Sequence, residues 1–372
     1  MHAIAMAGLL LLLAPAALGA GTEAVVVDLD TDINPVTAEF VKRVVEEAVA
    51  GGAPAVVLRI NTPGGRLDST REITKTILAS EVPVIGFVHP PGSQAASAGF
   101  IILMACDVAA MAPGTNTGAA SPVGSGGEEL PKTIGKKVSE DAAALVRSLA
   151  VPRGRPVEDA VKTISEALSY SESEAQEKKL VEIVARDLPD LFKQLDGRPI
   201  KRVGKPDVTL KSATYTFRTE RKTGLEKALG VIASPMVAGI LFLIGVVGLY
   251  SEFQSPGAIL PGVLGSICLL LAFFAMSVLP TNWVGIGLIL LGVLFFFLEV
   301  KFTMHGILAI SGGVSIILGA VLLFHRDEFA PRAELWFIVG GAAVTTVILA
   351  GLSLMALSVQ RLPGRTGVAV LV

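Results

Sequence analysis

The feature that most constrains this 372-residue sequence is the uneven distribution of its charged side chains. Residues 21–227 hold most of them, whereas residues 228–358 consist of long apolar runs. Charged residues make up 17% of the chain, against about 25% in an ordinary soluble protein. The asymmetry predicts two domains, a soluble one large enough for its own core and one that lies in a membrane.

The apolar part divides into five candidate membrane spans. Each span has roughly the 20 residues that are needed to cross about 30 Å of hydrocarbon. We expect the spans near residues 228–250, 258–279, 283–300, 304–324 and 336–358. An odd number of spans places the basic residues Arg361 and Arg365 in the cytoplasm, as the positive-inside rule prefers.

The first twenty residues have the pattern of a secretory signal peptide. Leu9–Leu13 is a short apolar core, and the small residues Ala17–Ala20 follow where a signal peptidase would cut. No Lys or Arg precedes the apolar core, so an uncleaved anchor is the alternative. In both cases the following segment is translocated. We therefore expect a multi-pass protein of the cell membrane with its soluble domain outside the cytoplasm.

The soluble part alternates strand and helix patterns. Apolar runs that predict strands occur at residues 24–29, 55–60, 82–88 and 107–111, and helical patterns such as 35–50 and 67–78 lie between them. This alternation is typical of βαβ units and a parallel sheet. Nearly continuous apolar strands agree, because a parallel sheet is covered on both faces. We expect an α/β domain over residues 21–220, followed by an all-α transmembrane helix bundle over 228–358.

Composition excludes several classes of function. A net charge of −2 favours no nucleic-acid partner. The two cysteines, Cys106 and Cys268, both lie in apolar runs and predict small buried side chains rather than a disulfide or a metal cluster. No phosphate-binding loop or ligand cluster is found in the sequence, so we expect neither a metal nor a cofactor.

Two turns rich in small residues follow the second and third predicted strands. The first is Asn61–Gly65 (NTPGG) and the second is Gly92–Gly99 (GSQAASAG). Active sites of parallel sheets are assembled at this end of the strands. A Gly-Gly pair can leave backbone N–H groups free to face a developing negative charge. Ser97 stands at the start of the next helical run, 98–106, between small residues that leave its hydroxyl accessible.

A serine nucleophile needs a base, and the histidines are poorly placed to supply one. His89 is nearest in sequence to Ser97, but it is expected at a strand end, so a Ser-His-Asp triad is not favoured. A lysine can act instead when burial lowers its pKa. Lys132, Lys136 and Lys137 lie between a Gly/Ser-rich loop expected over residues 115–131 and a helix expected over residues 138–149. The spacing alone does not choose among them.

Simpler interpretations exist for each of these residues. Ser97 could be a helix N-cap, and the lysines could lie on a solvated helix face beside Glu140 and Asp141. Ser93 and Ser121 are alternative nucleophiles, although both lie in Gly/Pro-rich loops. The acidic residues near the ends of the spans, Glu252 and Glu299, are expected at the membrane interface.

The combined motifs resemble a known family. Asn-Thr-Pro-Gly-Gly, then Ala-Ala-Ser-Ala-Gly around Ser97, then a lysine about 40 residues later are similar to the ClpP-class serine proteases. The membrane spans make the long-form NfeD membrane proteases the nearest resemblance, over roughly residues 22–358. It implies a ClpP/crotonase-like βαβ spiral fold. Ser97 matches the family's nucleophile, and Lys137 matches its general base.

The same resemblance implies further roles. The backbone N–H groups of Gly65 and Ala98 would form the oxyanion hole, and Gly64 and Ala96 would bind substrate. The expected substrate is a hydrophobic peptide segment, notably of a stomatin-like membrane protein, and the protease domain is expected to form a homodimer or a higher homo-oligomer. No metal or cofactor is implied.

One departure from the family keeps a second function open. Long-form members usually end in a small β-barrel of OB type, whereas this sequence stops after a short tail, 359–372, so we expect that domain to be missing. A non-catalytic scaffold that binds stomatin-like proteins is therefore the main alternative. A crotonase-type acyl-CoA enzyme shares the Gly-rich turns, but a secreted domain without a basic CoA-binding cluster argues against it.

Overall fold

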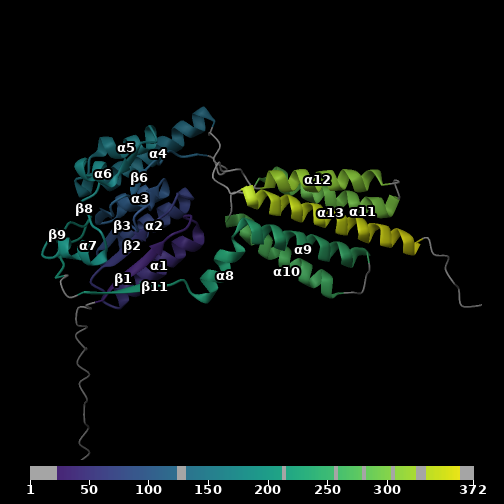
Figure 1. Ribbon diagram of the computed structural model, residues 1–372, viewed down its shortest axis with the longest axis horizontal. Coiled ribbons are helices and arrows are strands. Elements are labelled where there is room, and N and C mark those ends of the chain that lie inside the picture. Colours follow the sequence, from purple (N-terminus) through teal and green to yellow (C-terminus); the bar gives the residue numbers. More distant parts are fainter. Residues whose placement is uncertain are drawn as a thin grey trace, which may run out of the picture. The chain divides into compact units, whose positions relative to one another are not determined.

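The computed structural model describes residues 23–123, 131–211, 215–254, 259–278, 282–302, 306–323 and 332–360. They fall into two compact units (Figure 1). The α/β unit comprises the described residues of Met1–Ile33, Val41–Ala120 and Val146–Arg221, and the helical unit those of Asn34–Phe40, Ser121–Leu145 and Lys222–Val372. The expected signal peptide, 1–20, and nearly all of the tail, 359–372, lie outside the described residues.

Strands and helices alternate along the first two-thirds of the chain. The strands are β1 (Glu23–Leu29), β2 (Val56–Ile60), β3 (Val84–Val88), β4 (Gln94–Ala96), β5 (Val108–Met111), β6 (Asn116–Gly118), β7 (Ser169–Ser171), β8 (Ile183–Val184), β9 (Pro199–Ile200), β10 (Val208–Thr209) and β11 (Thr216–Glu220). The helices are α1 (Pro35–Ala50), α2 (Leu67–Ala79), α3 (Ala98–Ala105), α4 (Lys132–Ala150), α5 (Val157–Ser165), α6 (Glu172–Glu177) and α7 (Leu188–Leu195), with a 3₁₀ turn at Val151–Arg153.

The main sheet has six parallel strands in the order β11-β1-β2-β3-β5-β8 (Figure 1). Alternate side chains of its strands, such as Val57 and Phe87, form a core with the apolar face of α7. The opposite face is covered as well. A Cβ on Gly86 would lie 2.8 Å from the Leu103 side chain of α3, so this strand position has no room for a larger residue. The expected parallel α/β fold is confirmed, and four strands begin within two residues of their predicted starts.

A second sheet of three short strands, β4-β6-β7, holds the Ser97 segment. Strand β6 lies in the Gly/Ser-rich stretch 115–131, which the sequence predicted to be a loop throughout. The loop prediction is wrong for β6, because Thr117 is fully buried and its hydroxyl donates to the Ala95 carbonyl at 2.9 Å. Residues 124–130 of the same stretch lie outside the described residues.

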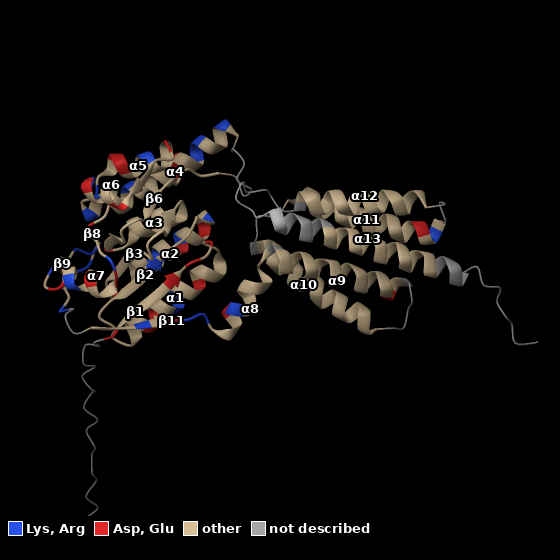
Figure 2. Ribbon diagram, in the orientation of Figure 1, with Lys and Arg blue, Asp and Glu red and all other residues tan. Residues whose placement is uncertain are grey.

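The helical unit contains one short helix, α8 (Gly224–Ile232), and five longer apolar helices. These are α9 (Pro235–Gln254), α10 (Leu260–Val278), α11 (Trp283–Phe302), α12 (Ile307–Leu323) and α13 (Arg332–Gln360). Within the described residues, α9, α10 and α11 are long and apolar enough to cross a membrane, and α12 and α13 contribute shorter apolar stretches. Acidic and basic residues are frequent in the helices from α1 to α8, except in the apolar α3, whereas the described parts of α9 to α13 carry very few (Figure 2).

The first expected span, 228–250, is divided in the structure. Helix α8 ends at Ile232, and α9 begins at Pro235, whose missing backbone N–H suits the first turn of a new helix. The apolar composition continues through the break, so composition alone did not reveal it. The span therefore starts close to Met236 instead of residue 228.

Helices α11 and α12 form an antiparallel pair held together by glycine. Gly292 faces Gly312, and Gly319 faces Gly285. A Cβ added to Gly292, Gly312 or Gly319 would lie less than 3 Å from the backbone of the other helix. Beyond these pairs, the buried Glu299 carboxylate accepts hydrogen bonds from the N–H groups of Gly306 at 2.8 Å and Leu308 at 3.2 Å. Glu299 thus caps the start of α12, and its position at the membrane interface stays a prediction.

Candidate active site

Ser97 occupies a strained backbone position between β4 and α3. Its φ is 51° and its ψ is −113°, a combination that side chains rarely adopt. Backbone hydrogen bonds enforce it: the Ser97 N–H donates to the Gly118 carbonyl at 2.9 Å, and the Ser97 carbonyl accepts from the Phe100 N–H at 3.1 Å. Strain that the surrounding fold maintains is characteristic of functional sites.

The Ser97 hydroxyl does not cap the helix. Ser97 is at the N-cap position of α3, but its side chain accepts no hydrogen bond from the first turn of the helix. The N-cap interpretation of Ser97 is therefore wrong, because the unusual backbone angles carry the side chain away from the first turn of the helix. Ser97 is partly exposed, so the hydroxyl is available to another molecule.

The Pro-Gly-Gly turn lies directly beside Ser97. A Cβ added to Gly64 would lie 2.7 Å from the Ser97 Cβ and 3.1 Å from its Oγ. Gly64 and Gly65 have φ values of +134° and +150°, which only glycine adopts without strain. Two bonds of 2.8 Å fix the turn: the Ile33 N–H donates to the Gly64 carbonyl, and the Ile33 carbonyl accepts from the Arg66 N–H.

Thr62 joins the two turns, a role that the sequence analysis did not assign. Its N–H donates to the Gln94 carbonyl at 2.8 Å, and its carbonyl accepts from the Ala96 N–H at 3.1 Å. Its fully buried hydroxyl accepts from the Gly64 N–H and lies 3.1 Å from the Gly64 carbonyl. Thr62 therefore fixes Gly64 relative to the strand that leads into Ser97. Only its place in the NTPGG motif hinted at this role.

Two backbone N–H groups near Ser97 are uncommitted. Among the hydrogen bonds of the described residues, neither the Gly65 nor the Ala98 N–H donates to another group of the chain. The Gly65 N–H is free because the bridge between Ile33 and Gly65 uses the Gly64 carbonyl and the Arg66 N–H, not the N–H of Gly65 itself. Ala98 is the first residue of α3, where N–H groups have no partner within the helix and the helix dipole is positive. The two amides predicted for an oxyanion hole are thus both free.

The three candidate lysines lie on α4. The sequence placed them in or after a loop, with a helix from residue 138, but α4 already begins at Lys132 because the Pro131 carbonyl accepts the first helical bond, from the Gly135 N–H at 2.8 Å. Lys132, Lys136 and Lys137 are exposed and belong to the helical unit, whereas Ser97 belongs to the α/β unit. The pairing of Ser97 with Lys137 stays a prediction.

The alternative nucleophile Ser93 and the alternative base His89 are both packed against other parts of the chain. Ser93 is 3% exposed, which leaves its hydroxyl inaccessible to a substrate. The His89 ring lies against Phe87, with 4.9 Å between ring centroids. Burial and then the nearby Arg59 guanidinium lower the pKa of His89. The described contacts of His89 are therefore those of a packed side chain at a strand end, as the sequence suggested.

The far end of α3 is clamped by two arginines that the sequence analysis did not single out. Arg155, 3% exposed, donates to the Met104 carbonyl at 2.9 Å and to the Cys106 carbonyl at 3.1 Å, and pairs with Glu182 at 2.7 Å. Arg153 also donates to the Cys106 carbonyl, at 2.9 Å. These bonds satisfy the last carbonyls of the helix that Ser97 precedes. Burial raises the pKa of the Cys106 thiol to about 12, so this cysteine is a packed, unreactive side chain.

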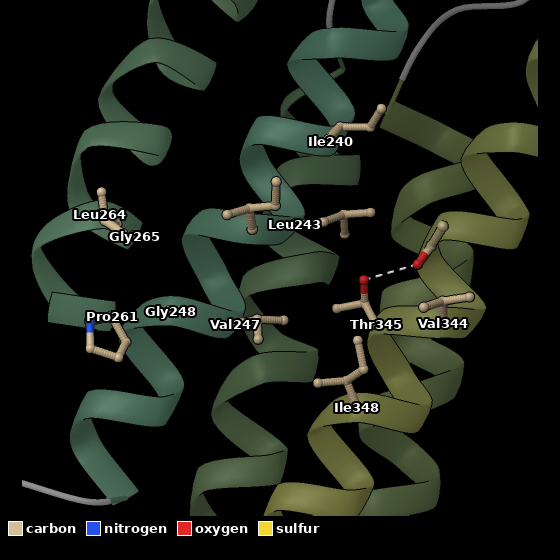
Figure 3. A pocket seen from close by; sticks show the side chains of 12 residues that line it. Ile240, Leu243, Val247, Gly248, Pro261, Leu264, Gly265, Val344, Thr345 and Ile348 are labelled. Carbon is tan, nitrogen blue, oxygen red and sulfur yellow. Dashed lines mark hydrogen bonds between the residues drawn. The ribbon is translucent and has the colours of Figure 1, made fainter. Parts of the chain in front are cut away.

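A pocket in the helical unit has no comparable chemistry. It is lined by α9, α10 and α13 (Figure 3). Thr345 is its polar side chain, and the Thr345 hydroxyl donates to the Gly341 carbonyl at 2.9 Å within the same helix. Among the described residues, no group of three or more His, Cys, Asp or Glu side chains is placed to hold a metal. The Ser97 region is therefore the best candidate active site.

Comparison with known families agrees with this division of the chain. The family model for the NfeD1b N-terminal domain matches residues 23–191, and the model for the NfeD integral membrane domain matches residues 236–357. Membrane-bound protease PH1510 of Pyrococcus horikoshii is 33% identical over 319 residues, which are 84% of this chain and 71% of that protein. Membrane protein NfeD1b of Bacillus subtilis is 28% identical over 334 residues, 87% of this chain and 72% of that protein.

Solved structures resemble the α/β unit. The 1510-N membrane protease specific for a stomatin homologue, from Pyrococcus horikoshii, matches with a TM-score of 0.50 and 31% identity, over 57% of this chain and 98% of that one. A lysine-to-alanine variant of the 1510-N stomatin-specific protease, in complex with a substrate peptide, matches with a TM-score of 0.52 and 33% identity, over 56% of this chain and 97% of that one. A serine-to-alanine variant of the same protease matches with a TM-score of 0.51 and 32% identity, over 54% of this chain and 98% of that one.

Fold and comparisons together define the class of protein. It is a membrane protein in which an α/β domain with the fold of the 1510-N protease precedes a region of apolar helices. Its match to PH1510 covers 71% of that protease at 33% identity. The chain belongs to the NfeD family of membrane-bound proteases.

Proposed function

We propose that this protein is a serine endopeptidase in which Ser97 is the nucleophile and Lys137 is the general base. The observation that carries the proposal is the state of Ser97. Its backbone is held at φ 51°, its hydroxyl makes no capping bond, and the N–H groups of Gly65 and Ala98, the residues that follow Gly64 and Ser97, make no hydrogen bond among the described residues. A structural serine has no need of this arrangement, whereas acyl transfer uses each part of it.

The reaction follows from these groups. The Ser97 Oγ attacks the carbonyl carbon of the scissile peptide while the uncharged Lys137 amine takes its proton. The carbonyl oxygen becomes an oxyanion that accepts hydrogen bonds from the N–H groups of Gly65 and Ala98. The lysine then returns the proton to the leaving amine, and water hydrolyses the acyl-enzyme by the same route in reverse. Removing one oxyanion donor typically costs about 10²–10³ in kcat.

The proposed substrate is an extended hydrophobic peptide segment. Gly64 and Ala96 would border it, and their small size allows its backbone to come close to Ser97. A stomatin-like membrane protein is the proposed source of the segment, because the similar solved structures are of a stomatin-specific protease. We place the protease domain outside the cytoplasm, and we propose that it works as a homodimer or a higher homo-oligomer.

Lys137 is assigned by resemblance, and Lys132 and Lys136 are its competitors. A lysine-to-alanine variant of the related protease was captured with a substrate peptide, which supports a lysine base in the relative. In this chain the three lysines lie within two turns of α4, so single substitutions separate them.

The experiment measures cleavage of a hydrophobic peptide by the purified full-length protein in nanodiscs. We expect Ser97→Ala and Lys137→Ala to abolish cleavage, and Ser93→Ala, Lys132→Ala and Lys136→Ala to retain it. Full activity in Ser97→Ala would reject the proposal. If the wild type cleaves nothing, yet wild type and Ser97→Ala capture a stomatin-like protein equally, the non-catalytic scaffold is the correct function.

A further inference from the structure

Helix α8 (Gly224–Ile232) lies in a part of the chain that neither family model covers. The two matched regions end at residue 191 and begin again at residue 236. Only Ala233 and Ser234 separate α8 from α9, the first of the membrane-spanning helices (Figure 1). Its role is therefore a question that the family assignment leaves open.

The helix is amphipathic, with an apolar face that its own unit covers only in part. Leu225, Leu229 and Ile232 follow one another at the four- and three-residue spacing of one helix face. None of the residues of α8 is buried: Leu225 is 70% exposed, and Leu229 and Ile232 are half-buried. Large apolar side chains gathered on one exposed face mark an interaction surface.

The local sequence nevertheless favours a helix that starts at Gly224. Thr223 and Glu226 form a complete capping box, in which each side chain accepts from the backbone N–H of the other residue. A helix of nine residues is far below the length that is stable alone in water, even with a good cap. An apolar environment outside the chain is therefore needed to stabilise α8, and its exposed face is where that environment must lie.

Chain connectivity shows which environment is within reach. The membrane-spanning window of α9 begins at Met236, four residues after Ile232. Four residues span at most about 14 Å even when fully extended, and the headgroup layer on each side of the hydrocarbon is about 5–8 Å thick. The end of α8 therefore lies within about 14 Å of the hydrocarbon that α9 would enter, which brings the headgroup layer of that leaflet within its reach.

The charges near α8 fit the same environment. Arg221, Lys222 and Lys227 are basic, and the acidic residue among residues 221–227, Glu226, is engaged in the capping box. Lys227 lies on the helix side opposite the apolar face. A short helix with an apolar face, basic residues and a position at the bilayer boundary has the properties of a helix that lies in the plane of the interface.

We propose that α8 lies in the membrane interface as an in-plane anchor, with Leu225, Leu229 and Ile232 inserted among the lipid chains and Lys227 facing water. The occupant of the apolar face is the lipid surface. The helix then fixes the point at which the chain leaves the soluble domain and enters the bilayer. This proposal does not depend on peptidase activity.

The test uses the full-length protein in nanodiscs that contain brominated phosphatidylcholine and phosphatidylglycerol. Single cysteines replace Leu225, Leu229 or Lys227 in a Cys268→Ala background and are labelled with an environment-sensitive fluorophore. The remaining native cysteine, Cys106, is fully buried and will not label. Lys227→Cys is the matched control, because it lies on the same helix and on the opposite side.

We expect bromine quenching at least twofold stronger at Leu225 and Leu229 than at Lys227, with blue-shifted emission at the first two positions. Weak quenching and water-like emission at all three would show a helix that is free in solution. Blue-shifted emission without quenching would show a protein contact in place of lipid. Equal, strong quenching at all three would show a fully immersed segment. Each of these three results overturns the proposal.

Discussion

Both units of the molecule depend on glycine where chain segments approach closely, but for different physical reasons. In the α/β unit, Gly64 and Gly65 have positive φ values and shape the turn beside Ser97. In the helical unit, Gly292 and Gly312 have ordinary helical backbones and bring α11 against α12. The first pair is needed for backbone conformation as well as for space, and the second for space alone.

The difference separates two consequences of substitution. A side chain at the turn would change the geometry around one hydroxyl, so we expect it to affect cleavage more than stability. A side chain between the membrane helices would push two packed helices apart, so we expect it to affect stability more than cleavage. Substitutions in the α/β unit should therefore lower the rate of cleavage, and substitutions in the helical unit should lower stability.

The largest effect is expected from Gly64→Ala. The added methyl group would lie 2.7 Å from the Ser97 Cβ, so Ser97 or the turn must move. A displacement of about 1 Å at a reacting group can cost about 100-fold in rate, and we expect a loss of at least about that size in peptide cleavage. The control is Gly92→Ala, where φ is +87° but no atom lies within 4 Å of an added Cβ. Equal losses in both variants would point to backbone strain as the cause and not to the contact with Ser97.

The next effect is expected from Gly292→Val in the helical unit. Its side chain would meet the Gly312 carbonyl and Ile316 at 2.6 Å, and overpacking of this kind costs about 1–3 kcal/mol. We expect a lower thermal unfolding midpoint in nanodiscs, with cleavage retained below it. Gly287→Val is the matched control, because the same helix leaves open space at that position. If Gly287→Val lowers the midpoint equally, the close approach of α11 and α12 is not what glycine provides.

A smaller effect on catalysis is expected from Thr62→Val. The variant keeps the shape of the side chain but leaves the buried Gly64 N–H without its acceptor, which costs about 1–3 kcal/mol. We expect kcat to fall about tenfold, with the KM for peptide little changed and with recovery in Thr62→Ser. An unchanged kcat would show that Gly64 is held in place without the Thr62 hydroxyl.

The smallest effect is expected from Tyr250→Phe. The Tyr250 hydroxyl lies 2.5 Å from the Ser353 hydroxyl and joins α9 to α13. Hydrogen bonds between membrane helices contribute about 0.6 kcal/mol on average, so the unfolding midpoint should fall only slightly. The double variant with Ser353→Ala should add little to either single change. Fully additive effects would mean that the two hydroxyls do not act on each other.

Sequence patterns predicted the strands β1, β2, β3 and β5 of the main sheet because each is a largely apolar run. The edge strands β8 and β11 were missed, since β8 has only two residues and β11 is polar. The motif residues Gly64, Gly65, Ser97 and Ala98 also lie where the order of strands and turns places them, at the ends of neighbouring strands. These predictions rest on local periodicity and on the general geometry of parallel sheets.

Contacts between distant segments account for what the sequence did not reveal. Thr62 and Ile33 fix the Pro-Gly-Gly turn, and Arg155 clamps α3 from 49 or more residues away along the chain. No periodicity signals such pairs. The strand β6 was missed because its polar composition is typical of a loop, and the break before Pro235 was missed because apolar residues lie on both sides of it.

The most direct test of the account is covalent labelling of the purified wild-type protein with a serine-reactive probe, followed by mass-spectrometric mapping of the modified residue. We expect a single modified serine, Ser97, and loss of the modification in Lys137→Ala but not in Lys136→Ala. Modification of Ser93 or Ser121 in place of Ser97, or unchanged labelling in Lys137→Ala, would contradict the proposed nucleophile and base.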